Sequence, residues 1–343
     1  MISFLNDYNE VAHKEILESF NKYSNQKFVG YSEDELGKES IELIRKKLND
    51  PSAEIHFVHG GTIANVLGLI LSLQRHQSII ATDTGHIVNT ENASIESVGH
   101  QIVLVKNENG KVTVDAAKKA LSDHSNEYNS QPKVIYISNV TETGAVYTKN
   151  EIIDLHNFCK ENDLYLFVDG ARLGNAIMSN KSDLEFSDMA KYVDVFTIGG
   201  TKNGFMFGEA IVFINEELKT NYARMIIKQK GALLAKGFLY GIQFKTMFEK
   251  DLYFRLASHA VEMGEKLAEI FKKHNIKIVN PVDANLIFVE LSKDIHEQLS
   301  KEFIYSYDPI DDNKGICRFV TTWNTKEEEI KSLEKAFNQL FNN

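Results

Sequence analysis

The sequence predicts an α/β protein with a mostly parallel sheet flanked by helices, followed by a smaller α+β domain. Short apolar runs of strand length alternate with segments of helical periodicity through the first two thirds of the chain. This alternation stops after Asn215. The chain has 343 residues and is 43% apolar, enough for two hydrophobic cores. We expect a large domain at residues 1–248 and a small domain at residues 249–343.

Seven strands are expected in the large domain, each a short apolar run bounded by turn residues. They are residues 54–58, 78–82, 101–105, 133–138, 164–168, 193–198 and 210–214. Helical periodicity marks residues 63–75, 113–121 and 149–161 between them. Only a short loop joins the last two strands. A crossover helix does not fit there, so this pair is expected to be antiparallel.

The pattern after residue 215 predicts mostly helix and then the small domain. Residues 220–248 are expected to form a helix that is interrupted near Gly231 and Gly237. A long amphipathic helix is expected at residues 251–274, strands at 276–279, 285–291 and 315–321, and a closing helix at 326–341.

Composition excludes several classes of protein. No run approaches the roughly 18 apolar residues of a membrane span, and the first residues lack the basic lead and apolar run of a secretory signal. Cys159 and Cys317 are expected to be buried reduced thiols of a cytoplasmic protein. The net charge of −10 argues against a nucleic-acid partner. A small molecule is therefore the expected ligand.

Lys202 and Asp169 carry the strongest chemical signal. Lys202 lies in the glycine-flanked loop 199–204, after one predicted strand, and Asp169 directly follows the strand before it. Pyridoxal phosphate (PLP) chemistry requires a lysine that forms a Schiff base and a carboxylate that keeps the pyridine nitrogen protonated. Motifs typical of a metal site or a serine nucleophile are lacking. The two residues together predict a PLP site.

An anion site is expected where the first strand of the sheet meets its helix. Gly60 and Gly61 precede Thr62 at the start of that helix, where backbone N–H groups and the helix dipole favour a phosphate. The segment is neither a Walker A loop nor a GxGxxG turn. His86 follows the second strand and is a candidate to stack on a cofactor ring, while Arg172 and Arg318 are candidates to bind a carboxylate.

The chain resembles the threonine aldolase and β-eliminating lyase family of fold type I PLP enzymes. The resemblance covers nearly the whole chain and is carried by residues 4–8, 30–34, 60–65, 83–91, 169–173, 201–204 and 318–321. It implies that Lys202 binds the cofactor covalently, that His86 stacks on the ring and that Asp169 meets the ring nitrogen. Cofactor-binding roles are also implied for Gly61, Thr62, Thr201 and Arg172, and substrate-binding roles for Asn6, Tyr31, Arg172 and Arg318. A homodimer or homotetramer with shared active sites is implied, with Tyr31 contributed by a neighbouring subunit.

Two segments depart from the family pattern. Many threonine aldolases carry a histidine after the fourth strand, where this chain has Glu142 within residues 138–144, and Asn6 stands at the position of a family serine. The favoured function is cleavage of a β-hydroxy-α-amino acid of the threonine or allo-threonine type to glycine and an aldehyde. The base for the β-hydroxyl proton is His86, Glu142 or a water molecule. The alternatives are a β-eliminating lyase or aminotransferase, a catalytically silent PLP-binding protein, and a nucleotide-binding α/β domain.

Overall fold

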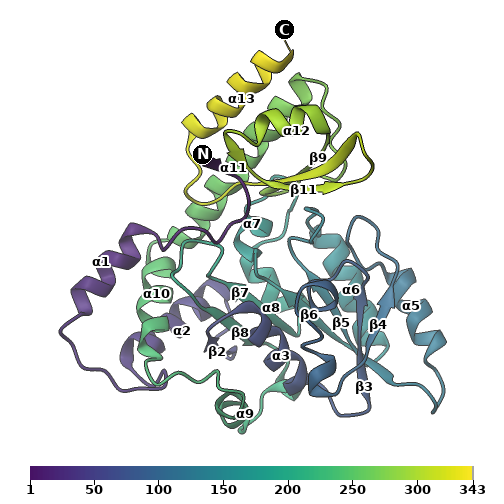
Figure 1. The fold of residues 1–343 in the computed structure, drawn as a ribbon. Coiled ribbons are helices and arrows are strands. Elements are labelled where there is room, and N and C mark those ends of the chain that lie inside the picture. Colours follow the sequence, from purple (N-terminus) through teal and green to yellow (C-terminus); the bar gives the residue numbers. More distant parts are fainter. Residues whose placement is uncertain (342–343) are drawn as a thin grey trace.

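The large part of the molecule is built on one seven-stranded sheet, as expected. The computed structural model describes residues 1–341. The strand order is β2-β8-β7-β6-β5-β3-β4 (Figure 1). The bounds are β2 Glu54–Val58, β3 Gln77–Thr82, β4 Ile102–Val105, β5 Gln131–Ser138, β6 Tyr165–Asp169, β7 Val195–Gly199 and β8 Glu209–Phe213. β8 is antiparallel to β7 and to β2, and the remaining pairs are parallel. The predicted antiparallel pair is confirmed.

Helices cover both faces of this sheet, because its strands carry apolar side chains on both faces. One hydrophobic core joins the sheet to α3 (Gly61–Ser72) and α9 (Ala223–Gln229). The other joins it to helices of the opposite face: α1 Lys14–Tyr23, α2 Glu35–Leu48, α5 Val114–Asp123, α6 Lys149–Glu161 and α10 Phe238–Glu249. Helices α1 and α2 were not predicted from the sequence. Shorter helices are α4 His86–Asn89, α7 Leu173–Ile177, α8 Met189–Tyr192 and the 3-10 turns Glu96–Val98, Phe186–Asp188 and Glu216–Leu218.

The small part is an antiparallel sheet of order β11-β12-β9 with helices on one face. Its strands are β9 Leu286–Ser292, β11 Ser306–Pro309 and β12 Lys314–Val320, and its helices are α11 Leu252–Lys273, α12 Lys293–Leu299 and α13 Glu327–Phe341. The strand predicted at residues 276–279 is wrong: only an isolated bridge between Ile278 and Val289 forms there. Strand β11 was not predicted, because its polar and exposed residues lack strand alternation.

The N-terminal residues lie against the small part. β1 (Ile2–Ser3) pairs in parallel with β10 (Phe303–Ile304), and the Phe4 side chain is buried among residues of α11, β9 and β12. The predicted domain division placed this segment with the large domain. A two-residue strand has no readable period, so nothing in the sequence indicated its partner. The chain then crosses to the large part.

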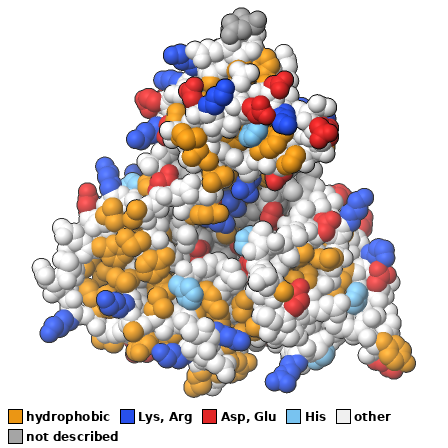
Figure 2. All heavy atoms as spheres, in the orientation of Figure 1, with side chains coloured by type: hydrophobic (Ala, Val, Ile, Leu, Met, Phe, Trp, Pro, Cys, Tyr) orange, Lys and Arg blue, Asp and Glu red, His pale blue; other side chains and the backbone are white. Residues whose placement is uncertain are grey.

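The carboxyl ends of β2, β3, β5, β6 and β7 share one edge of the sheet, and the small part sits over that edge (Figure 1). Figure 2 shows a hollow between the two parts in which basic, acidic and histidine side chains gather. Within residues 1–341, no helix has the length and apolar character needed to cross a membrane. The edge below the small part is where the predicted site residues must be sought.

Candidate active site

Lys202 lies in the loop that joins β7 to β8. This loop is closed at Gly200, whose N–H donates to Gly208 O (3.1 Å) and to Glu209 Oε2 (3.0 Å). Gly200 has no room for a side chain, because a Cβ atom would meet the backbone of Gly208. The Lys202 ammonium has no hydrogen bond or ion pair with any described residue. Burial lowers its pKa and the Arg172 charge lowers it further, while Asp7 and other carboxylates act in the opposite direction.

Asp169 ends β6 and is held by donors on both oxygens. Its Oδ2 accepts hydrogen bonds from Tyr136 Oη (2.6 Å) and Asn65 Nδ2 (2.8 Å), and its Oδ1 accepts the Ala171 N–H (2.9 Å). Burial raises the pKa of the carboxyl, but the His86 charge and the three donors outweigh it, so the pKa is lowered. Asp169 is therefore a buried carboxylate that stays ionised.

His86 begins α4 and is oriented by Glu91. The Nδ1 atom lies 2.8 Å from Glu91 Oε1, which also accepts a hydrogen bond from Asn65 Nδ2 (2.8 Å). Burial lowers the pKa of His86, but the Glu91 hydrogen bond and the Asp169 charge outweigh it, so the pKa is raised. His86 therefore holds its proton more firmly than a free histidine does.

Asn65, Glu91 and Tyr136, which link His86 to Asp169, had no predicted role. Asn65 is a buried polar residue in an otherwise apolar stretch of α3, and this was the available signal. Tyr136 has the pattern of an ordinary strand tyrosine, and its role depends on pairing between β5 and β6.

Glu142 lies in the loop after β5 and contacts the start of α4. Its Oε1 accepts hydrogen bonds from Ser138 Oγ (2.6 Å) and from the His86 N–H (2.9 Å). Burial raises the pKa of Glu142, although Ser138 acts in the opposite direction. The predicted residues His86 and Glu142 are thus neighbours in space.

Arg172 is already engaged by a carboxylate of the same chain. Its Nε donates to Asp7 Oδ2 (2.6 Å) and its Nη2 to Asp7 Oδ1 (3.0 Å). Both side chains are buried, with 15% and 1% exposed. Asn285 Nδ2 also donates to Asp7 Oδ2 (3.1 Å), which ties the pair to the small part. The predicted bidentate edge of Arg172 is therefore occupied by Asp7.

Arg318 lies in β12 and lacks an anionic partner among residues 1–341. Its Nε is buried and makes no hydrogen bond. The adjacent residues Cys317 and Phe319 point into the core of the small part, so Arg318 points to the opposite face of the sheet. That face is turned toward the large part (Figure 1). Arg318 forms no salt bridge with any described side chain. A role in binding a carboxylate therefore fits Arg318 better than a structural salt bridge does.

The N-terminus of α3, where an anion site was expected, is open. Gly60 is its N-cap and provides no side-chain hydrogen bond, and a Cβ atom added to Gly60 or Gly61 would meet no other atom within 4 Å. Thr62 is exposed. Val58 and Gly199 both lie opposite Glu209, so the end of β2 is close to the lysine loop. The first turn of α3 thus has free N–H groups near Lys202.

Three further predicted residues differ in their placement. Thr201 lies next to Lys202, and its hydroxyl accepts the Gly208 N–H (3.3 Å). Asn6 precedes the buried Asp7, but its Oδ1 accepts the N–H of Tyr8 (3.1 Å). Tyr31 is 41% exposed, and its ring contacts Lys228 Nζ (4.6 Å) rather than the residues around Lys202. Within one chain, Tyr31 is not part of the site.

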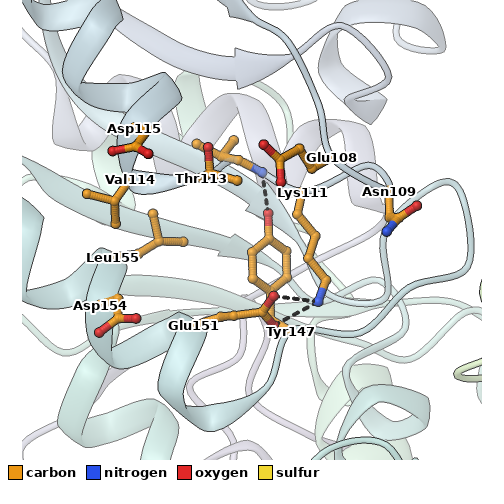
Figure 3. Close-up of a pocket in the computed structure, with 11 residues that line it drawn as sticks. Glu108, Asn109, Lys111, Thr113, Val114, Asp115, Tyr147, Glu151, Asp154 and Leu155 are labelled. Atoms are coloured by element: carbon orange, nitrogen blue, oxygen red, sulfur yellow. Dashed lines mark hydrogen bonds and ion pairs between the residues drawn. The ribbon is translucent and has the colours of Figure 1, made fainter.

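A separate pocket of about 330 Å³ lies beside α6 and the loop before α5 (Figure 3). Its central polar groups are paired with each other. Lys111 Nζ donates to both Glu151 oxygens (2.8 and 2.7 Å), and Tyr147 Oη accepts the Val112 N–H (2.7 Å). The residues around Lys202 remain the stronger candidate for chemistry.

The arrangement around Lys202 suits PLP. A phosphate would bind the N–H groups at the start of α3, with Gly61 and Thr62, and a pyridine nitrogen would find the ionised Asp169. Lys202 is partly buried and has no partner among the described groups, as a lysine that must bind a cofactor covalently requires. His86 and Thr201 flank this space. The Arg318 Nε, which is buried without a hydrogen bond, would provide a separate place for a carboxylate.

Comparison with known proteins gives a consistent result. The model of the family described as beta-eliminating lyase matches residues 35–294. A low specificity L-threonine aldolase of Pseudomonas aeruginosa is 32% identical over 294 residues, which cover 84% of each chain. A second, from Pseudomonas sp., is 30% identical over 291 residues, or 84% of this chain and 83% of the relative.

Solved structures agree in fold. A structure of Leishmania major threonine aldolase is 38% identical, with a TM-score of 0.97 and 99% of both chains covered. An aspartate aminotransferase variant of Thermus thermophilus is only 14% identical and shows the fold alone, with a TM-score of 0.73 over 99% of this chain and 92% of the other. The expected fold type I architecture is confirmed. The protein is a member of the beta-eliminating lyase family, as its sequence motifs indicated.

Proposed function

We propose that the protein is a PLP-dependent aldolase that cleaves a β-hydroxy-α-amino acid, of the threonine or allo-threonine type, to glycine and an aldehyde. The names of the Pseudomonas and Leishmania relatives support this substrate class. The observation that carries the proposal is the combination of an unpaired, partly buried Lys202 and an ionised Asp169 held by three donors. When bound, PLP supplies the electron sink that stabilises a carbanion at Cα.

The residues of this chain have separate tasks in holding the cofactor. Lys202 provides the amine that attaches to it, and Asp169 keeps a proton on the ring nitrogen. The start of α3, with Gly61 and Thr62, binds the phosphate, and Thr201 lines the same side. His86 covers the ring. Because Glu91 fixes the imidazole, His86 has a defined orientation before a ligand arrives.

Arg318 is the proposed main partner of the substrate carboxylate. Its Nε is buried without a hydrogen bond, whereas the Nε and Nη2 atoms of Arg172 are bound to Asp7. Arg172 then contributes through its remaining N–H groups and by its charge, and Asn6 lies next to the pair. A planar guanidinium binds a carboxylate in a fixed orientation, which selects the bond to be broken.

Glu142 is the better candidate for the base that takes the β-hydroxyl proton. His86 is bound at Nδ1 by Glu91, and its pKa is raised. The raised pKa favours the imidazole form that already carries both protons, and this form cannot accept another. Burial raises the pKa of Glu142 as well, and for a carboxylate this makes a stronger base. Glu142 Oε1 is used by two donors, which leaves Oε2 for a substrate hydroxyl or a water molecule.

Replacing Glu142 by Gln tests this assignment. The amide oxygen can still accept the Ser138 and His86 hydrogen bonds, so the loop should keep its structure. Turnover should fall by about 100-fold or more, because general base catalysis contributes roughly 10²–10⁴. The acidic limb of the pH–rate profile should also disappear. Turnover and profile like those of the unmodified enzyme would exclude Glu142 as the base.

The reaction itself is tested by separate detection of each product. The PLP-loaded protein should convert threonine, allo-threonine and phenylserine to glycine and the matching aldehyde, without ammonia. The family also includes β-eliminating enzymes, so cysteine and β-substituted alanines belong in the same assay. If those compounds yield pyruvate and ammonia while threonine is inert, the aldolase assignment is wrong and the protein is a β-eliminating lyase.

We further propose a cytoplasmic homodimer or homotetramer in which Tyr31 completes the site of a neighbouring subunit. Cys159 and Cys317 are buried and not bonded to each other, as in a reducing compartment. Tyr31 is exposed, and within its own chain its ring contacts Lys228 rather than the residues around Lys202. Sedimentation of the protein, and loss of activity on Tyr31→Ala with unchanged association, would support shared sites. A monomeric active enzyme would exclude them.

A further inference from the structure

Glu209 is a buried carboxyl beside the lysine loop to which the proposed reaction gives no task. It begins β8, whose five residues are all buried, and only 4% of its surface is exposed. In the sheet it lies opposite Gly199 on β7 and Val58 on β2. A carboxyl in the middle of a sheet costs free energy unless it has a partner or a function.

Two groups of the lysine loop, the Gly200 N–H and the Thr201 hydroxyl, donate hydrogen bonds to Glu209, and neither of them requires a charged acceptor. Its Oε2 accepts the Gly200 N–H (3.0 Å), but the same N–H also donates to Gly208 O (3.1 Å). The Gly200 O atom accepts the N–H groups of Asn203 (2.8 Å) and Phe205 (3.3 Å). The backbone of the loop is therefore closed without Glu209. Glu209 thus adds contacts at Gly200 and Thr201 to a loop whose backbone is already closed, and a neutral amide in its place could accept the same hydrogen bonds.

The charges around Lys202 differ in how far they are neutralised. Asp7 and Asp169 also raise the pKa of Lys202, but Asp7 is paired with Arg172 and Asp169 acts on the neighbouring His86 as well. Glu209 forms no salt bridge with any described side chain, and the Lys202 ammonium likewise has none. The ionisable groups that act on Glu209 are Lys202 of the loop and Asp169 of β6, and Tyr253 of α11 is influenced by it in turn. Lys202 is the only cation in this set.

We propose that Glu209 is a positioning residue for Lys202, which anchors the first turn of the lysine loop through Gly200 and holds the proton on the lysine amine by its unshared negative charge. Burial raises the pKa of Glu209 to about 7, although Thr201 and Lys202 favour its ionised form. Glu209 thus changes charge near neutral pH. The amine is more basic when Glu209 is ionised and less basic when it is neutral.

The test measures Lys202 in the protein without PLP, so it does not depend on the proposed reaction. Lys202 is acylated in a short pulse at pH values from about 5.5 to about 9.5, a range that spans neutral pH. Labelling of its peptide is quantified by mass spectrometry against the exposed Lys119 as internal reference. The variant Glu209→Gln keeps an oxygen for the Gly200 N–H and removes only the charge.

Lys202 of Glu209→Gln should be labelled about three- to tenfold faster above pH 7.5, because loss of a nearby opposite charge lowers the pKa of an amine. The difference should vanish toward pH 5.5, where Glu209 of the unmodified protein is neutral. Glu54→Gln removes a carboxylate at the first residue of β2, in the same sheet, and should match the unmodified protein. Equal Lys202 profiles in Glu209→Gln and the unmodified protein would overturn the proposal.

Two further measurements keep the proposal testable if Glu209→Gln does not fold. The unmodified protein itself should show a Lys202 labelling profile with a second inflection near neutral pH, and a profile with a single inflection would overturn the proposal. Glu209→Asp keeps the charge, so its Lys202 labelling profile should show the same second inflection. PLP binding and turnover are measured separately, so failure of the aldolase assignment would leave the labelling result unchanged.

Discussion

Asp169 shows at the residue scale how the fold keeps a buried charge. Three donors and the neighbouring His86 favour its ionised form and outweigh the cost of burial. The carboxylate is therefore prepared before a cofactor binds. This arrangement depends on Asn65 from α3 and Tyr136 from β5, two elements that are distant in sequence.

Replacing Asp169 by Asn should leave the fold intact and reduce turnover by at least tenfold. A charge-assisted hydrogen bond contributes roughly 1.5–3 kcal/mol, and each ~1.4 kcal/mol changes a rate tenfold. Turnover and PLP content should be measured together on the purified variant. Tyr136→Phe removes one donor and keeps the charge, so its loss should be smaller. A well-folded Asp169→Asn enzyme with full turnover would exclude the electronic role.

Replacing Arg318 by Lys should raise KM for the amino acid and leave PLP affinity largely unchanged. A lysine keeps the positive charge but cannot bind a carboxylate with two parallel N–H groups. A loss of about tenfold or more in kcat/KM is expected from one weakened charged hydrogen bond. Steady-state kinetics and PLP titration separate the two effects. Loss of PLP with an unchanged KM would instead place Arg318 in the cofactor site.

At the scale of elements, the close approach of the segments after β6 and β7 positions the two central residues. Gly170 follows Asp169, and its N–H donates to Thr197 Oγ1 (2.8 Å), while the Gly199 N–H donates to Gly170 O (2.9 Å). A Cβ atom on Gly170 would collide with Thr197 O. The distance between Asp169 and the lysine loop is thus set by close backbone contact and by the Thr197 hydroxyl.

Gly170→Ala should therefore destabilise the protein and impair PLP binding together. Overpacking typically costs about 1–3 kcal/mol, and here the backbone of β7 must move. Urea unfolding of the protein without PLP gives the loss of stability. The matched control for stability, measured without PLP, is Gly61→Ala, where a Cβ meets no atom within 4 Å and alanine favours helix. Equal stability of the two variants would show that the contact does not constrain the fold.

At the scale of the whole molecule, the two parts meet over the carboxyl edge of the sheet and enclose several ionisable groups. The N-terminal segment links them, because β1 pairs with β10 and Asp7 binds both Arg172 and Asn285. Burial of charge at this junction makes stability depend on pH. Glu209 and Glu142 both have raised pKa values because they are buried.

Glu209 should make the protein less stable as the pH rises from about 5 to 8. Its pKa is about 7 in the folded protein and 4.5 for the unperturbed group. The folded state therefore binds more protons in this range, and stability falls as the pH rises through it. Each pKa unit corresponds to ~1.4 kcal/mol, so the effect is on the order of 3 kcal/mol.

Urea unfolding of Glu209→Gln and of the unmodified protein, both without PLP, measures this contribution. The variant should gain stability relative to the unmodified protein between pH 5 and pH 8, because an amide has no charge to bury. A constant difference between the two across this range would show that Glu209 does not titrate there. Glu54→Gln again controls for the change in net charge.

The alternation of strand and helix along the sequence determined the seven-stranded sheet, and the position of Lys202 and Asp169 after neighbouring strands predicted the centre of the candidate site. The strands could be predicted because periodicity and strand ends are local properties of a chain. Helices α1 and α2 and the strand β11 were missed, since their patterns are short or polar. Residues 276–279 were apolar enough for a strand but lack a partner along their length.

The tertiary structure decided which groups are free and which are paired. Arg172 and Arg318 look alike in sequence, but only the fold brings Asp7 from the other end of the chain to one of them. The network of Asn65, Glu91 and Tyr136 likewise forms across separate elements. Whether a buried charge is neutralised depends on its neighbours in three dimensions, and a sequence orders residues in one dimension only.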